Sequence, residues 1–226
     1  MYFPFYIARR YLLSKKKHNA INIISAISAF GVMGGSIAFI VVLSVFNGFE
    51  GVVLSLFNSF NPDIRITVAE GKTFVFDDDQ KEMIEGMPGV AHYHEVVEEV
   101  ALLRYKDKQH IATLKGVGVD YHLMSGLDTM IYAGEFLLDE RGVVRGVLGA
   151  GIAFKLGAAM QDLQNPVEVY MPDRLASPGD ISGSFTVMNM FPAGIFSIQQ
   201  DIDNRYGLVP IQFMRQLLHY DNEVTS

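Results

Sequence analysis

The sequence has 226 residues, of which half are hydrophobic and 19% are charged, and its mean hydropathy is +0.22. This apolar composition excludes an intrinsically disordered chain, and the absence of cysteine excludes a disulfide framework, a thiolate metal site and a cysteine nucleophile. The net charge of −7 argues against nucleic acid as a partner, because nucleic-acid binding requires a basic surface.

The charges are distributed unevenly along the chain. Residues 1–50 carry five basic side chains and one acidic side chain, a net charge of +4, whereas residues 51–226 carry 13 basic and 24 acidic side chains, a net charge of −11. Over the 31 residues 19–49 the sequence has no formal charge. About 20 apolar residues are enough to cross the hydrocarbon core of a bilayer as a helix. The sequence therefore predicts one transmembrane helix.

Two other interpretations of this apolar segment stay open. A cleaved signal peptide has a shorter apolar region, of about 7 to 15 residues, followed by a small-x-small cleavage site. A core helix of a globular domain is the other alternative, although such helices rarely stay uncharged over this length. For a membrane span, the basic residues that precede it predict a cytoplasmic N-terminus and an extracytoplasmic location for the residues after about 50.

Residues 1–18 are predicted to form a short interfacial helix on the cytoplasmic side of the membrane. Phe3, Ile7 and Tyr11 share its apolar side, and its basic residues would lie near anionic lipid. The alternative is a frayed basic tail.

The transmembrane helix and a stalk that continues it are predicted over residues 19–60, since apolar residues recur at helical spacing beyond Glu50. Within the span, small residues follow one another at intervals of three or four and therefore share one helix face: Ser28, Gly31, Gly35 and Ala38. Such a face lets another helix approach closely, so we expect these residues to pack against partner helices.

Residues 61–226 are predicted to form an extracytoplasmic domain of the α+β class. Strands are expected at 63–69, 96–105, 109–117, 146–149, 167–171 and 184–198, with 96–105 and 109–117 forming a hairpin. Helices are expected at 78–85, at 150–156 and after Pro210, where one face holds Ile211, Met214, Leu217 and Leu218. The aspartates at 77–79 are interpreted as a helix cap rather than as a cation site.

Motifs that carry chemistry are scarce. The sequence has no P-loop, no complete dinucleotide fingerprint, no G-x-S-x-G and no H-E-x-x-H. His92 and His94 alternate near several glutamates, which is compatible with a metal site, but such pairs are mostly exposed polar positions. We therefore predict no catalytic residue, no metal site and no cofactor in this chain.

Several segments together resemble one family of membrane proteins. They are the aromatic-Ile-Ala-x-Arg-Tyr-Leu pattern at 6–12, VVLSVFNGFE at 41–50, EEVALLRY at 98–105, LKGV at 114–117, VLGAGIAFKLG at 147–157 and GLVPIQFMRQLLHY at 207–220. These segments are similar to the LolC/LolE family of lipoprotein-releasing ABC transporter permeases, which belongs to the MacB/FtsX-like superfamily. The resemblance extends over the chain from end to end, and its most specific part is the segment 41–50, which matches the end of the family's first membrane helix.

The resemblance implies a fold and a set of partners. Permeases of this family have four membrane helices and a large MacB-like periplasmic core domain between the first and the second, so we expect this chain to be the N-terminal part of a longer inner-membrane protein. The implied partners are a cytoplasmic ABC ATPase that hydrolyses ATP, a second permease subunit of the same chain or a paralogue, a lipoprotein substrate and a periplasmic lipoprotein chaperone. The alternatives are a MacB-like efflux or export permease, an FtsX-like permease that controls a cell-wall hydrolase, and a single-span sensor or anchored binding domain.

The resemblance also suggests two groups of contact residues. At the outer end of the membrane helix, the candidates for lipoprotein contact are Val42, Val45, Phe46 and Phe49, for which ordinary helix packing or lipid contact is the alternative. The segment 171–185 is long for a loop in a compact domain and lies where the family carries its chaperone-binding hook. Its candidates are Met171, Pro172, Arg174, Leu175 and Pro178, and the alternative is a surface insertion.

Overall fold

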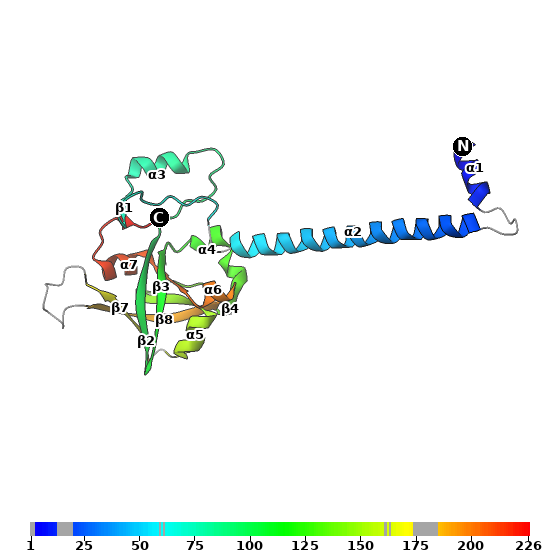
Figure 1. The fold of residues 1–226 in the computed structure, drawn as a ribbon. Coiled ribbons are helices and arrows are strands. Elements are labelled where there is room, and N and C mark those ends of the chain that lie inside the picture. Colours follow the sequence, from blue (N-terminus) through cyan, green and yellow to red (C-terminus); the bar gives the residue numbers. More distant parts are fainter. Residues whose placement is uncertain are drawn as a thin grey trace. The chain divides into compact units, whose positions relative to one another are not determined.

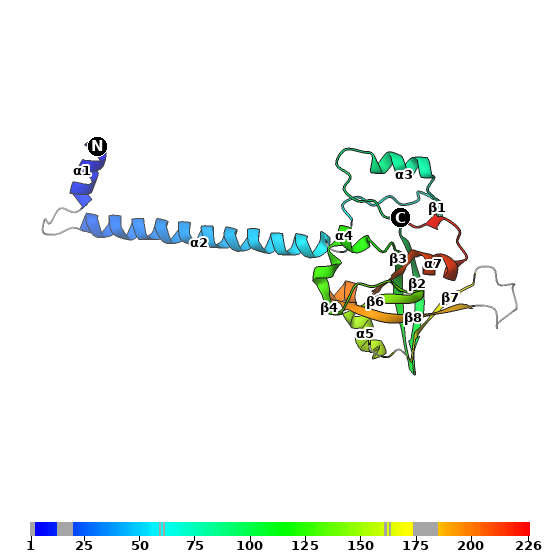
Figure 2. The same ribbon diagram turned by 180° about the vertical axis from the view of Figure 1, so that it is seen from behind.

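The computed structural model describes residues 3–12, 20–58, 60, 62–160, 162, 164–173 and 185–226. The chain forms two compact units, Met1–Leu54 and Ser55–Ser226. Figure 1 and Figure 2 show the ribbon from two opposite sides.

Helix α1 (Phe3–Leu12) and the part of helix α2 (Ala20–Asn58) up to Leu54 make up the described part of the first unit. Helix α1 has Arg9 and Arg10 in its last turn. The short N-terminal helix predicted from the sequence thus forms, while its place at a membrane surface remains a prediction. Helix α2 has 39 residues and would be about 58 Å long at about 1.5 Å per residue.

Helix α2 contains the candidate membrane span. Within the described residues, one helical segment is long and apolar enough to cross a membrane, namely Ile23–Val53, with a mean hydropathy of 2.3 over its most apolar window. None of that window is buried by the rest of the chain. An apolar helix that its own chain leaves uncovered is typical of a segment that lies in lipid or against partner helices.

The second unit is an α+β domain built on an eight-stranded sheet. The sheet order is β4 (Ile131–Gly134), β8 (Phe185–Phe196), β7 (Val167–Pro172), β2 (Val97–Tyr105), β3 (Lys108–Val117), β9 (Tyr206–Pro210), β6 (Val143–Gly149) and β5 (Asp139–Glu140). Two further strands, β1 (Phe74–Val75) and β10 (Glu223–Val224), pair separately. The helices are α3 (Asp78–Glu85), α4 (Tyr121–Ser125), the 3₁₀ turn η1 (Leu127–Met130), α5 (Ala150–Leu156), α6 (Gln200–Asp203) and α7 (Ile211–Leu218).

Strand β8 closes the sheet into a ring of paired strands. Its first half pairs antiparallel with β7, and its second half pairs parallel with β6. Strand pairing therefore runs from β8 through β7, β2, β3, β9 and β6 back to β8. A closed circuit of this kind protects most strand edges and encloses one apolar interior.

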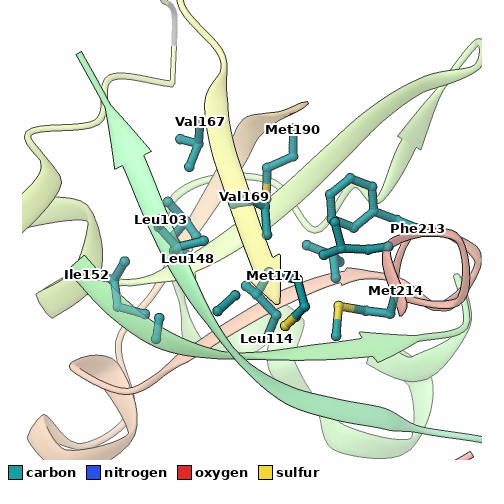
Figure 3. Packing of buried hydrophobic residues seen from close by; sticks show 14 of the residues in the cluster. Leu103, Leu114, Leu148, Ile152, Val167, Val169, Met171, Met190, Phe213 and Met214 are labelled. Carbon is teal, nitrogen blue, oxygen red and sulfur yellow. The ribbon is translucent and has the colours of Figure 1, made fainter. Parts of the chain in front are cut away.

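The main hydrophobic core lies between the sheet and the helices α5 and α7. Alternate residues of β2 and β7, such as Leu103 and Val169, are fully buried, and Met214 of α7 belongs to the same cluster. Figure 3 shows buried side chains gathered between the strands, with Phe213 and Met214 reaching in from helix α7. A second cluster is formed by other buried residues of the domain, several of them strand neighbours of first-cluster residues: Phe60, Val96, Val117, Tyr121, Leu127, Leu138, Val147, Phe196 and Leu208.

Several predicted elements are confirmed. Helix α3 begins after Asp77, whose side chain accepts from the backbone N–H of Asp78 while the Gln80 side chain closes a capping box, so the helix-cap interpretation holds. The hairpin of β2 and β3, the strand-to-helix unit of β6 and α5, and the long strand β8 also form. On α7, Met214, Leu217 and Leu218 are buried as expected, and Phe213 is buried with them.

One predicted strand is wrong. Residues 63–69 form bends and irregular backbone and belong to neither sheet. Their isoleucines alternate as in a strand, but Ile64 is 81% exposed and Ile66 is 45% exposed, so the alternation marks no buried face. Period-two apolar spacing predicts a strand only where a neighbouring strand and a core lie beside it.

Candidate functional site

The candidate lipoprotein-contact residues lie on the surface of α2. Val42, Val45, Phe46 and Phe49 are each between 52% and 67% exposed. Phe46 and Phe49 also line a shallow apolar groove with Glu50 and Val53. The described chain thus leaves this part of the helix free to contact lipid, a partner helix or an acyl chain.

The small residues of α2 also share an uncovered surface. Ser28, Gly31, Gly35 and Ala38 are all exposed in this chain. A Cβ atom added at Gly31 or Gly35 would meet no atom within 4 Å, because nothing in the described chain packs there. Their role in helix packing stays a prediction about a partner.

The candidate chaperone loop follows β7. Pro172 is exposed at the end of the strand, but Met171 is only 1% exposed and belongs to the main core. The two side chains point to opposite faces because successive residues of a strand alternate. Met171 is therefore a core residue and does not offer an apolar edge to a partner, which corrects the sequence prediction. Arg174, Leu175 and Pro178 lie outside the described residues.

The two histidines considered for a metal border a pocket of about 390 Å³ together with Glu85, Tyr93 and Asp120. The His94 ring packs edge-on against Tyr121, with 5.7 Å between ring centroids. Burial, followed by the neighbouring charge of His92, lowers the pKa of His94 below its ordinary value. Among the described residues, no group of three or more His, Cys, Asp or Glu side chains is placed to hold a metal ion.

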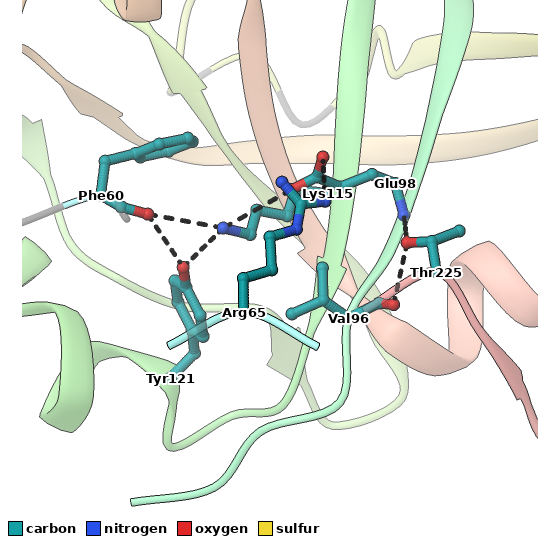
Figure 4. A network of polar contacts seen from close by, with 7 residues as sticks. All are labelled: Phe60, Arg65, Val96, Glu98, Lys115, Tyr121 and Thr225. Carbon is teal, nitrogen blue, oxygen red and sulfur yellow. Dashed lines mark hydrogen bonds and ion pairs between the residues drawn. The ribbon is translucent and has the colours of Figure 1, made fainter. Parts of the chain in front are cut away.

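A buried polar cluster of the domain was not predicted. Lys115 of β3 is 4% exposed, and its Nζ donates to the Tyr121 hydroxyl at 2.7 Å and to the Phe60 carbonyl oxygen at 3.5 Å. The Glu98 carboxylate lies 3.7 Å from the same Nζ, and Arg65 binds the other carboxylate oxygen at 3.1 Å. Figure 4 shows the cluster.

The charged groups of this cluster are paired and hydrogen-bonded within it. A buried ammonium is costly unless it is paired and hydrogen-bonded, and Lys115 has both: two hydrogen bonds and an ion pair with Glu98. Burial lowers the pKa of Lys115 to about 8, although the nearby Glu98 carboxylate opposes this shift. Burial also raises the pKa of Tyr121, so its hydroxyl stays protonated and donates to the Phe60 carbonyl at 3.3 Å.

The sequence carried one signal of this cluster. Lys115 interrupts the otherwise uncharged buried stretch from Ala112 to Val117, and a lone cation in a central strand must find acceptors. Its partners lie 6 to 55 positions away in the sequence, which sequence spacing alone does not reveal. The Lys115 ammonium is enclosed by its hydrogen-bond and ion-pair partners and is 4% exposed, so its geometry suits a structural anchor rather than a chemical step.

The structural comparisons give weak similarities to transporter domains. The extracellular domain of the noncanonic ABC-type transporter YknZ from Gram-positive bacteria is 16% identical, with a TM-score of 0.47, covering 70% of this chain and 72% of that one. The periplasmic region of MacB from Actinobacillus actinomycetemcomitans is 14% identical, with a TM-score of 0.41, covering 64% and 59%. At these TM-scores the similarities carry no argument about function.

The sequence comparison gives a match that covers more of the chain than the structural matches do. No family model matches the chain. A curated relative, the lipoprotein-releasing system transmembrane protein LolC of Neisseria meningitidis serogroup B, is 26% identical over 98% of this chain. The chain spans about half the length of that relative, 52%. The resemblance to the LolC/LolE family of permeases that the sequence motifs carry is thereby confirmed over nearly the whole chain.

Proposed function

We propose that this chain is the N-terminal part of a permease subunit of an ABC transporter that extracts lipoproteins from the inner membrane and passes them to a periplasmic chaperone. The observation that carries the proposal is the similarity of 98% of the chain to a LolC transmembrane protein. A separate cytoplasmic ATPase would supply the energy, and a second permease subunit would complete the membrane part.

The first unit supports a role in binding the lipid part of the substrate. Its span is apolar and uncovered by the rest of the chain, and Phe46 and Phe49 are about two-thirds exposed. An acyl chain binds to such a surface because contact removes apolar surface of both from water. In this proposal the outer end of α2 contacts lipoprotein acyl chains, and the small-residue face packs against another membrane helix.

The decisive test is a lipoprotein-release assay. The full-length protein that contains this chain would be reconstituted with its ATPase and partner permease in proteoliposomes loaded with a lipoprotein, and transfer to an added soluble chaperone would be measured with and without ATP. We expect ATP-dependent transfer. ATP hydrolysis without any transfer would contradict the proposal, and ATP-dependent export of small molecules or activation of a cell-wall hydrolase would identify the alternative permease classes.

The loop after β7 gives a more specific prediction. Replacing residues 174–182 by a Gly-Ser linker of equal length removes the candidates Arg174, Leu175 and Pro178. The replacement keeps Pro172 and also Asp173, whose carboxylate lies 3.8 Å from His219 Nε2. We expect chaperone binding and transfer to be lost while ATP hydrolysis persists. Phe154→Ser is a matched surface control, because Phe154 is 86% exposed and lies on α5. Transfer at the normal rate after the loop replacement would show that the loop is only a connection.

A further inference from the structure

The segment that enters the domain is anchored by both its side chain and its backbone. Phe60 lies two residues after the last residue of α2 and is 3% exposed. Its ring packs against Tyr206 at 4.8 Å between centroids and against Phe196 at 6.1 Å. Its carbonyl oxygen accepts hydrogen bonds from Lys115 and Tyr121. Phe60 and the described residues 62–66 are here called the entry segment, and Phe60 attaches this segment to the second core cluster.

Glu98 supplies the charge that holds this anchor in place. One oxygen of its carboxylate lies 3.7 Å from the Lys115 ammonium, and the other accepts from Arg65, which belongs to the entry segment itself. Without Glu98, the buried ammonium would lose its counter-charge, and Arg65 would lose its acceptor. Glu98 thus holds the entry segment through two independent contacts.

The same residue also holds the C-terminal segment, residues 223–226, through its backbone. The Glu98 N–H donates to the Thr225 hydroxyl at 2.9 Å, and that hydroxyl donates to the Val96 carbonyl at 3.1 Å. The Val96 N–H donates to the Ser226 carbonyl at 2.7 Å, and the Thr225 N–H returns a bond to the Val96 carbonyl at 2.9 Å. Figure 4 shows both sets of contacts meeting at the start of β2.

We propose that Glu98 is a positioning residue that couples the entry segment to the C-terminal segment, so that the two segments open and close together. The inference rests on the proposed function, in which the chain continues from residue 226 into further membrane helices. Both connections of the domain to the membrane would then be joined at one strand end. A displacement of α2 would reach the second connection through the Arg65–Glu98–Thr225 contacts rather than through the whole domain.

Proteolysis under native conditions tests the coupling, because each segment contains a cleavage site of its own. Trypsin cleaves after Arg65 in the entry segment, and glutamyl endopeptidase cleaves after Glu223 in the C-terminal segment. When local opening is fast relative to cleavage, the cleavage rate at each site reports the population of the open form. The experiment uses the full-length protein in lipid nanodiscs, with mass spectrometry to quantify each cleavage.

Two substitutions each remove contacts on one side only. Glu98→Gln removes the carboxylate charge but keeps the backbone N–H that binds Thr225, and Thr225→Val removes the hydroxyl but leaves Arg65 and Lys115 untouched. We expect Glu98→Gln to speed cleavage after Glu223 as well as after Arg65, by about tenfold, the effect of losing one charge-assisted hydrogen bond. We expect Thr225→Val to speed cleavage after Arg65 as well as after Glu223, by about fivefold, since it removes neutral hydrogen bonds. Glu168→Gln is the matched control, since Glu168 pairs with Arg104 elsewhere on the sheet and should change neither site.

Two results would overturn the coupling. In the first, Glu98→Gln speeds cleavage only after Arg65, and Thr225→Val speeds cleavage only after Glu223. In the second, cleavage after Arg145 speeds up by the same factor, which would indicate general unfolding, because Arg145 is a mostly buried residue of β6. None of these rates depends on transport. The release assay on the same variants is a separate measurement, so a failure of the proposed function and a failure of the coupling remain distinguishable.

Discussion

At the residue scale, the most informative side chain is Lys115. Its ammonium is buried in a strand and must be held by a carboxylate, a hydroxyl and a backbone carbonyl at once. An apolar side chain of similar size would fill the same space without the cost of burying a charge. The lysine therefore fits a role in fixing Phe60 and Glu98 relative to each other better than a role in raising stability.

The lowered pKa of Lys115 predicts a specific pH dependence of folding. The folded chain releases the Lys115 proton near pH 8, whereas the unfolded chain keeps it until near its ordinary pKa of 10.5. Between these values the unfolded state binds more protons, so the free energy of unfolding rises with pH. We expect a rise of about 2 kcal/mol from pH 8 to pH 10, at about 1.4 kcal/mol per pKa unit.

The measurement is the free energy of chemical unfolding of the chain in detergent at each pH. The unfolding transition is monitored by the near-ultraviolet circular dichroism of the tyrosines. Lys115→Met is the matched variant, because it keeps the size of the side chain and removes the titrating group. The raised pKa of Tyr121 acts in the opposite direction as the pH approaches its ordinary value of 10.0, so it offsets only a small part of the rise at the upper end of this range. Equal slopes in the original chain and in Lys115→Met would refute the assignment.

At the element scale, local signals explain which parts of the fold were predictable. The capping box at Asp77 and the tight turn between β2 and β3 fix structure within a few residues, so both elements follow from the sequence alone. The closure of β8 onto β6 and the irregular backbone of 63–69 depend on which distant strands lie nearby. No spacing pattern in the sequence predicts the pairing of β8 with β6 or the irregular backbone of residues 63–69.

Among the candidate sites, too, features set by local sequence were predictable, and features set by distant residues were not. The uncharged run predicted a membrane-spanning helix because hydropathy is a local property, and the described helix is long and apolar enough to cross a membrane. The burial of Met171 depends on its register in β7, and one position along a strand reverses the face. The Lys115 cluster joins residues from four separate parts of the chain and was therefore invisible to motif searches.

The outer end of α2 gives a prediction about lipoprotein contact. A photocrosslinking amino acid at Val45, Phe46 or Phe49 of the assembled transporter should capture the lipoprotein several times more strongly than one at Ile24. Ile24 is a matched control because it is 63% exposed in the chain, compared with 64% for Val45, and it lies near the other end of the same helix. The readout is the yield of the crosslinked adduct on a denaturing gel. Equal yields at both ends would indicate general lipid or helix contact.

At the scale of the whole molecule, the charge asymmetry is the most consequential feature. The +4 of residues 1–50 and the −11 of residues 51–226 lie on opposite sides of the uncharged span. Positive charges are retained on the cytoplasmic side of a membrane, and the α+β domain would then fold outside the inner membrane. The proposed transfer of a lipoprotein to a periplasmic chaperone requires this orientation, because the chaperone and the domain must share a compartment.

The orientation predicts the behaviour of reporter fusions. A reporter that is active only after export, joined after Ser226, should be active, and the same reporter joined after His18 should be inactive. A reporter that is active only in the cytoplasm should give the reverse result at both positions. Replacing Arg9, Arg10 and the three lysines at 15–17 by glutamine should make the orientation mixed, because the span then loses the charges that hold its N-terminal end inside. Inverted activities in the unaltered chain would place the domain in the cytoplasm and would contradict both the orientation and the proposed function.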